Sequence, residues 1–409
     1  MAELAISCRR AIRDLPSPWF AERMALYFSA LFLIYGVHIT YFPVWLHGRG
    51  LSAENIGLIG AVPIFARAIL SPWIAAWADA RGNHRNVIIA LSLASVGLAL
   101  AVSQCASFWP IAIAAVPFAI AIAMIMPLTE TIAVAGVRSA GHDYGRMRIG
   151  GSAMFLVTTV LTGALVDKYG PDIIVGVLIA ASVATAGAAL LLPRPRQSER
   201  AAEEPETEAG LVFALMTQPL FVTFLFVTGA SMGSHAAFYT FGALHLRAQG
   251  MSGTAFGILW AISICAEMAL LAFSGRLIAM FGPVRLLIAG AAAAVVRWGA
   301  MSLDPPFAVL AGLQALHALT YGATHVGAIH FIARAVPTRG AGAAQALYSA
   351  IGSGLVTGAA TIVAGQYYPA LAGHTFLLMA ALAGAGLAAA IYIDKTWDKG
   401  PLGLTALKA

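Results

Sequence analysis

Residues 107–134 form an uninterrupted apolar stretch, SFWPIAIAAVPFAIAIAMIMPLTETIAV, in which Glu130 is the one charged residue. About 20 apolar residues in a helix are enough to cross a hydrocarbon core of roughly 30 Å. Backbone N–H and C=O groups cannot remain unpaired in lipid, so a segment that crosses it must be helical. The stretch therefore predicts a transmembrane helix.

The same pattern recurs along the whole chain. The 409 residues are 60% hydrophobic and 10% charged, whereas soluble domains carry about 25% charged residues. A surface so poor in charge must largely face lipid. We therefore predict an all-α membrane protein with twelve transmembrane helices, at 23–46, 54–78, 85–104, 107–134, 145–167, 171–193, 213–245, 252–280, 284–302, 305–335, 341–367 and 372–394.

The basic residues orient these spans. Nineteen of the 24 Lys and Arg residues fall on the side of the N-terminus, and three fall on the opposite side, namely Arg49, Lys168 and Arg247. Cytoplasmic loops are enriched in Lys and Arg, so both termini are expected in the cytoplasm, as in a bacterial-type inner (plasma) membrane. The net charge of +6 does not indicate a nucleic-acid partner, because the basic residues lie in separate loops.

The longest polar segment, RPRQSERAAEEPETEAG at 194–210, lies near the middle of the chain. Its charge, Pro and Ala content cannot form a core, which indicates a flexible cytoplasmic linker. The expected organisation is a cytoplasmic N-terminal segment, a six-helix bundle, the linker, a second six-helix bundle and a cytoplasmic tail, at 1–22, 23–193, 194–212, 213–394 and 395–409.

An internal repeat supports the division into two related bundles. At an offset of 200 residues, GLSAENIG (50–57) aligns with GMSGTAFG (250–257), and Gly82 and Arg85 align with Gly282 and Arg285. Duplicated bundles around a site at mid-membrane are a common transporter architecture. The repeat predicts pseudo-symmetric halves.

Ionisable residues inside the predicted spans are the candidate functional groups, because charge at the bilayer centre costs about 2.5–3.5 kcal/mol even on the lenient insertion scale. Glu267 lies near the middle of span eight, where loss of water disfavours its charged form. It can then bind and release a proton, or it can be permanently paired with a basic group. Arg67 occupies the equivalent position in the first half, and His38, His235 and His325 are further intramembrane groups.

Span ten carries a polar stripe. Four side chains recur at steps of three and four residues, which places them on one helical face, namely Gln314, His317, Tyr321 and Thr324. Such a face is costly in lipid, so we expect it to line a cavity. His317 can exchange protons near neutral pH, and Arg297, about 20 Å into span nine, is expected to join it and a carboxyl in one charge-coupled cluster.

A second pair lies in the first half. Glu130 is late in span four, and Arg146 and Arg148 open span five. A glutamate and an arginine on adjacent helices can clamp a polar or anionic ligand, or they can simply pair with each other.

These motifs resemble the major facilitator superfamily. The segment WADARGNHR (77–85) is similar to the family's loop signature between spans two and three, with Asp79, Gly82 and Arg85 at matching positions. Ala75 stands where the family usually has Gly. The resemblance implies the major facilitator fold and a conformational role for this loop.

The resemblance extends to the lactose-permease branch of that superfamily. Glu130 and Arg148, within GRMRIGG, match the branch's sugar-binding pair, and Arg297 and His317 match its proton-coupling pair. The branch's glutamate three residues after the histidine is replaced by Thr320, so Glu267 is the candidate proton carrier. The chain looks still more like the probable 3-phenylpropionic acid transporters, through VVRWG in span nine, LQ-x-LH in span ten and DYG-x-x-R at span five.

The resulting hypothesis is proton-coupled uptake of a small organic acid, such as the aromatic carboxylate 3-phenylpropionate, by alternating access. Arg148 and Arg297 would face the cargo carboxylate, while Tyr35, Phe238 and Tyr321 would join Glu130 in the substrate site. Glu267 and His317 would carry the proton. A proton-coupled sugar or oligosaccharide symporter and a drug:proton antiporter are the alternatives.

An enzyme is not expected. The sequence has no HExxH, P-loop or GxSxG motif, and Cys8, Cys105 and Cys265 are isolated, so neither a cofactor nor a metal site is indicated. The expected partners are a small-molecule substrate, protons and the lipid bilayer, and the protein is expected to function as a monomer.

Overall fold

The computed structural model describes residues 19–140, 143–193 and 208–403, and within these ranges all regular secondary structure is helical. The predicted linker residues 194–207 lie outside the described residues. The first half contains six continuous helices, α2 (Phe20–Gly48), α3 (Ala53–Arg81), α4 (His84–Ser103), α5 (Phe108–Ala140), α6 (Tyr144–Tyr169) and α7 (Ile173–Leu190). They confirm the first six predicted spans, with ends shifted by a few residues.

The second half has the remaining spans, but several of them are interrupted. Its α-helices are α8 (Glu208–Met216), α9 (Pro219–Gly233), α10 (Ala236–Ala248), α11 (Gly253–Ala272), α12 (Ser274–Met301), α13 (Phe307–Ala315), α14 (Thr324–Ala335), α15 (Ala341–Leu347), α16 (Val356–Leu371) and α17 (Thr375–Thr396). Short 3₁₀ turns η2 (Thr338–Gly340) and η4 (Ala372–His374) and π-helical segments η1 (Ala318–Ala323) and η3 (Tyr348–Leu355) complete it.

Within the described residues, ten helical segments are long and apolar enough to cross a membrane. One of them, Thr338–Thr396, has 59 residues and turns back at Ala372, where φ is 45°, so it contains two crossings. A further crossing, between Phe307 and Ala335, is divided by η1. The described residues therefore contain twelve crossings, as predicted.

The entry to span seven differs from expectation. We predicted a linker to residue 212 and a span from 213, but the chain is already helical from Glu208 in α8. The span itself begins at Pro219, which occupies the first turn of α9. Proline is favoured there because the first N–H groups of a helix have no partner within it.

The repeat is visible in the backbone. Gly50 and Gly250 have φ of 80° and 85°, and Gly82 and Gly282 have φ of 57° and 75°. Only glycine adopts this left-handed conformation at little cost, so the matching glycines end matching helices. Gly282 thus separates span eight from span nine inside α12.

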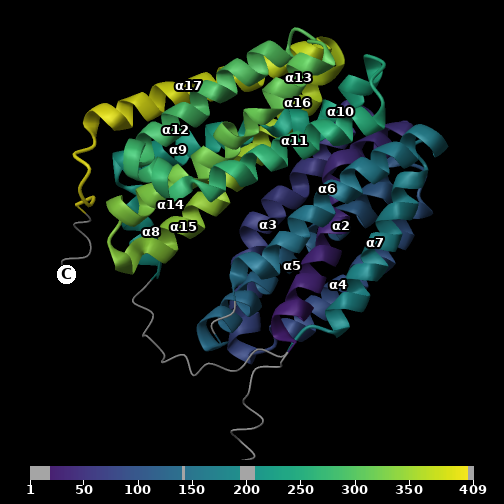
Figure 1. The fold of residues 1–409 in the computed structure, drawn as a ribbon, viewed down its shortest axis with the longest axis horizontal. Coiled ribbons are helices and arrows are strands. Elements are labelled where there is room, and N and C mark those ends of the chain that lie inside the picture. The colour runs from purple at the N-terminus through teal and green to yellow at the C-terminus, as the bar shows by residue number, and fades with distance from the viewer. Residues whose placement is uncertain (1–18, 141–142, 194–207, 404–409) are drawn as a thin grey trace, which may run out of the picture.

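The two halves meet along two pairs of helices, each with one helix from either half, namely α6 with α11 and α3 with α16 (Figure 1). Glycines allow a close approach. A Cβ atom at Gly57 would lie 3.1 Å from Cα of Gly365, and one at Gly257 would lie 2.9 Å from the carbonyl oxygen of Thr159. These contacts hold the halves together near the ends of the helices opposite the linker.

Candidate functional site

The predicted stripe of span ten is built on a π-helical segment. His317 precedes η1, Tyr321 lies in it, and His325 follows it at the start of α14. The rings of His317 and Tyr321 stack with centroids 5.3 Å apart, and those of Tyr321 and His325 with centroids 6.4 Å apart. Single π-helical turns inside α-helices are frequent at functional sites. Here the segment lies within the stacked stripe.

Arg297 on α12 is the centre of a buried network. Its side chain is 0% exposed. Nη1 donates to His317 Nδ1 at 3.1 Å and to Thr320 Oγ1 at 3.0 Å, and Nη2 donates to Gln314 Oε1 at 2.5 Å. The guanidinium also lies 4.4 Å from the ring centroid of Trp298, an arrangement that favours a cation. Three of the predicted residues, Arg297, His317 and Gln314, are therefore brought together.

The network determines which nitrogen of His317 carries the proton. Arginine can only donate hydrogen bonds, so His317 Nδ1 must accept. Nε2 then bears the hydrogen, and it lies 3.4 Å from Oε2 of Glu267. In this arrangement the imidazole is neutral and presents its N–H to the carboxylate. Protonation of Nδ1 as well would break the hydrogen bond that Arg297 donates to it.

His235 is a member of this cluster whose role the sequence pattern did not reveal. It lies at the break between α9 and α10, where Nδ1 is 3.0 Å from the carbonyl oxygen of Ser231 and Nε2 is 2.9 Å from Thr320 Oγ1. A carbonyl can only accept, so Nδ1 donates and Nε2 accepts the Thr320 hydroxyl hydrogen. Thr320 thus links Arg297 to the broken helix of span seven. Thr320 and His235 are 85 residues apart in the sequence, so no local pattern could indicate this contact.

Glu267 on α11 faces both halves of the molecule. Its side chain is 17% exposed, and besides His317 it interacts electrostatically with His325 and, across the interface, with Arg148. Arg67, which the repeat places opposite Glu267, interacts instead with Tyr35 and Tyr321. Among the described residues, Glu267 is therefore not permanently paired with Arg67.

In the first half, Glu130 and Arg148, for which the sequence left ligand binding and mutual pairing open, lie next to each other. Arg148 Nε on α6 lies 3.6 Å from Oε1 of Glu130 on α5, and the Tyr144 hydroxyl donates to Oε2 of Glu130 at 2.5 Å. The guanidinium stacks on Phe32 at 4.2 Å from the ring centroid. Both charged side chains are about one-third exposed, at 27% and 30%. The pair is long and accessible, so its arginine can receive another anion.

Two of the three aromatic residues predicted in the substrate site, Tyr35 and Phe238, differ in their surroundings. Tyr35 lies next to Phe32, with an edge-to-face contact at 5.3 Å, and its hydroxyl donates to the carbonyl oxygen of Ile122. Phe238 was expected to face a ligand, but it is 1% exposed and packs against Trp260 and the guanidinium of Arg297. In this conformation Phe238 supports Arg297 and offers no free face to cargo.

In the predicted conformational loop, the structure describes the turn at Gly82 and the contacts of Arg85. The side chain of Asp79 lies outside the described residues. Gly82 makes the turn, and Arg85 Nε and Nη2 donate to the carbonyl oxygens of Leu192 and Leu190, each at 2.7 Å. Arg85 therefore caps the C-terminal end of α7, where the helix dipole favours a positive charge.

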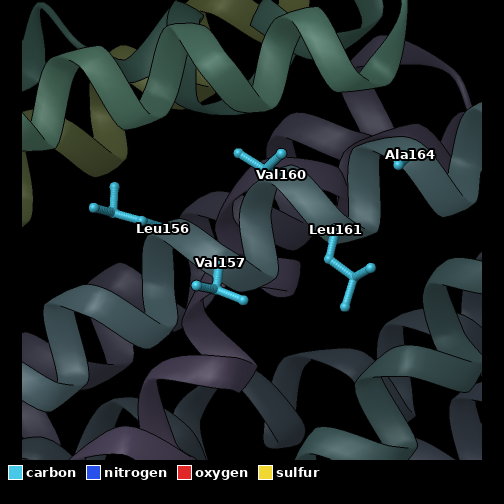
Figure 2. Close-up of a pocket in the computed structure, with 5 residues that line it drawn as sticks. All are labelled: Leu156, Val157, Val160, Leu161 and Ala164. Atoms are coloured by element: carbon cyan, nitrogen blue, oxygen red, sulfur yellow. The ribbon is translucent and has the colours of Figure 1, made fainter.

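A hollow on the surface does not contribute to this site. Figure 2 shows five apolar side chains of α6 that line it, Leu156, Val157, Val160, Leu161 and Ala164. None of them can orient a polar or charged ligand. The candidate site is the polar cluster around Arg297 in the second half, together with the Glu130–Arg148 pair of the first half.

A duplicated helical bundle with a charged network buried in its second half defines a secondary transporter of the major facilitator class. The chain belongs to the MFS_1 like family, whose family model matches residues 23–378. It is 29% identical over 360 residues to the "Probable 3-phenylpropionic acid transporter" of Escherichia coli (strain K12), which covers 88% of this chain and 94% of that protein.

Other similar proteins are named for different substrates. The "Maltose permease" of Geobacillus stearothermophilus is 25% identical over 341 residues, covering 83% of this chain and 86% of the relative. The crystal structure of the nucleoside transporter NupG aligns with a TM-score of 0.79 at 16% identity, covering 93% of this chain and 99% of that chain. The D-xylose-proton symporter aligns with a TM-score of 0.64 at 13% identity, covering 94% and 98%. These structural likenesses show the fold, which does not determine the cargo.

Proposed function

We infer that this protein takes up a small aromatic carboxylate, such as 3-phenylpropionate, together with a proton. The observation that carries the proposal is the placement of two ionisable residues on helices that pack across the interface, Arg148 on α6, 3.6 Å from Glu130, and Glu267 on α11, 3.4 Å from His317. One residue can bind an anion and the other can bind a proton, so the two halves can sense each other's occupancy. The relative named as a probable 3-phenylpropionic acid transporter supports the choice of cargo.

The chemistry around Arg148 suits such a cargo. An arginine fork can hold a carboxylate through two parallel hydrogen bonds. The existing bond to Glu130 is 3.6 Å long, so a cargo carboxylate can compete for the guanidinium. Phe32 and Tyr35 lie beside it and can contact an aromatic ring. Tyr321 from the second half interacts electrostatically with Arg148 and can close the site from that side.

Glu267 is the proposed proton carrier, and Nε2 of His317 faces its carboxylate at 3.4 Å. Proton binding to Glu267 removes a negative charge near Arg148, so the arginine becomes more attractive to an incoming anion. Release of the proton restores the negative charge of Glu267, which competes with the cargo carboxylate for Arg148 and favours release of the cargo. Alternating access between repeats then couples the two movements.

Uptake of labelled 3-phenylpropionate into vesicles tests this function. An inward proton gradient should accelerate accumulation, and dissipation of the gradient with a protonophore should abolish it. Vesicles without the protein measure diffusion of the uncharged acid. Accumulation that does not depend on the gradient would remove the proton-coupled assignment.

Sugar symport is the second candidate. Glu130 and Arg148 can bind hydroxyl groups as well as a carboxylate, and the maltose permease is a relative. Competition distinguishes the two cargoes. If unlabelled maltose or another sugar blocks uptake while aromatic acids do not, the sugar assignment replaces the aromatic one.

A further inference from the structure

We propose that His325 accepts the proton that leaves Glu267 and passes it to water. The proposal rests on the proposed proton-coupled function and adds a residue to it. Thr320 occupies the position where the glutamate of similar transporters is expected, and its hydroxyl is committed to Arg297 and His235. The proton therefore needs another route.

Contacts place His325 at the accessible end of the cluster. His317 is 3% exposed, whereas His325 is exposed. Glu267 packs against span ten between these two histidines, because a Cβ atom at Gly322 would lie 3.4 Å from Cγ of Glu267. His325 and Glu267 also interact electrostatically. A proton on Glu267 thus has a buried neighbour on one side and an exposed one on the other.

His317 cannot accept the proton from Glu267 without losing the hydrogen bond that Arg297 donates to it. His317 Nδ1 accepts from Arg297, and Nε2 already bears a hydrogen toward Glu267. His325 is bound differently, since its Nδ1 lies 3.0 Å from the hydroxyl of Tyr348. When Nδ1 donates to that oxygen, the lone pair of Nε2 is available.

The transfer is a simple acid–base step. Glu267 and His325 form no direct ion pair among the described residues, so one water molecule passes the proton: the Oε–H bond of protonated Glu267 breaks toward that water, and the water gives one of its own protons to Nε2 of His325, leaving a carboxylate and an imidazolium. The imidazolium then loses a proton to water on its exposed side and returns to the neutral form. The groups that face His325 are Glu267 from α11, Tyr348 from η3 and Tyr321 from its own span. None of these neighbours carries a positive charge, so the imidazolium is tolerated.

Two kinds of transport separate this role from cargo binding. Net uptake driven by a proton gradient requires proton release in every cycle, but exchange of internal for external cargo does not. In the His325→Gln variant we expect net uptake of 3-phenylpropionate to fall at least about ten-fold, because proton transfer by a positioned group contributes roughly 10²–10⁴-fold. Exchange should stay within about two-fold of the native rate, because exchange does not require the proton transfer that the variant lacks.

Two further variants complete the experiment. His325→Glu supplies another titratable acceptor and should recover part of the net uptake. His330→Gln, five residues further along α14, is the matched control and should behave like the native protein. Equal loss of exchange and net uptake in a monodisperse His325→Gln protein, or unchanged net uptake, would overturn the role of His325. Native uptake that ignores the proton gradient would instead overturn the proposed function.

Discussion

The guanidinium of Arg297 donates a hydrogen bond from Nη1 to Nδ1 of His317, at 3.1 Å. This bond leaves only Nε2 to carry the imidazole hydrogen, and Nε2 faces Glu267. A buried cation thus reaches the carboxylate through a neutral ring of defined tautomer. The relationship supports a division of roles in the proposed mechanism, with Glu267 binding the proton and His317 orienting that carboxylate.

This division of roles predicts unequal effects of two substitutions at His317. In His317→Gln the amide can occupy the position of Nε2 and still donate to Glu267. In His317→Asn the amide can only replace Nδ1. Since a hydrogen bond to a charged group contributes about 1.5–3 kcal/mol, net uptake in the Gln variant should exceed that in the Asn variant by about ten-fold or more. A more active Asn variant would show that the contact to Arg297 is the more important one.

Substitution of Glu130 distinguishes the two candidate cargoes. If the cargo is an anion, Glu130→Gln removes a competitor for Arg148, so the KM for 3-phenylpropionate should fall or stay within about three-fold of the native value. If the cargo is a sugar, the same change removes a hydroxyl acceptor, and uptake should be lost. Arg148→Gln is the companion variant, and it should abolish uptake of the aromatic acid. Loss of aromatic-acid uptake in Glu130→Gln would argue against the direct Arg148–carboxylate contact.

A contact between the halves should control their conformational equilibrium. Oδ1 of Asp167, at the end of α6, accepts from the backbone N–H of Gly253 at 2.6 Å, and Oδ2 accepts from that of Thr254 at 2.8 Å. These are the first N–H groups of α11, where a negative charge is favoured. Asp167→Asn should weaken this closure by about 1 kcal/mol, the typical worth of such a cap.

Distances between spin labels can measure that change. With labels at Lys168 and Gln249, which lie at this end of the two halves, Asp167→Asn should increase the population with a long separation. Asp172→Asn is the matched control, because Asp172 pairs with Arg49 inside the first half at 3.2 Å. An equal shift in both variants would show that the effect is not specific to the contact between the halves.

Thr320 should contribute to stability as well as to the site. Its hydroxyl accepts from Arg297 and donates to His235, so Thr320→Val leaves both partners buried with one bond fewer. The expected loss in the free energy of unfolding is about 1–3 kcal/mol. Thermal unfolding in detergent provides the measurement. Thr361→Val is the control, since that hydroxyl donates only within its own helix, to Thr357 at 2.8 Å. Equal losses of stability in Thr320→Val and Thr361→Val would contradict a special role for Thr320.

The fold was predictable because hydrophobic length and repeated turn residues are local signals. The glycines at 50 and 250, and those at 82 and 282, align by sequence and adopt the same left-handed backbone. The clustering of Arg297 with His317 was expected from depth in the membrane and helical periodicity. For Glu130 and Arg148 the sequence left ligand binding and mutual pairing open, and the structure has them 3.6 Å apart. These predictions used residues that are close in sequence or charges that need a partner.

Other features depend on residues that are far apart in the chain. The partners of Asp167 lie 86 and 87 residues away in the other half, and the partner of His235 lies in span ten. The π-helical segments leave no hydrophobic signature, because they change the helical register without changing composition. Phe238 was placed in the substrate site by its span alone, whereas the packing around Arg297 decides where its ring lies.

Proton movement that accompanies cargo entry tests the central claim most directly. In lightly buffered vesicles without an imposed gradient, addition of 3-phenylpropionate outside should cause a transient rise in external pH, measured against protein-free vesicles that report diffusion of the free acid. We predict that the rise above this background disappears in Glu267→Gln, while exchange of labelled cargo continues. Entry of labelled cargo through the native protein without alkalinisation, or alkalinisation that persists in Glu267→Gln, would contradict the account.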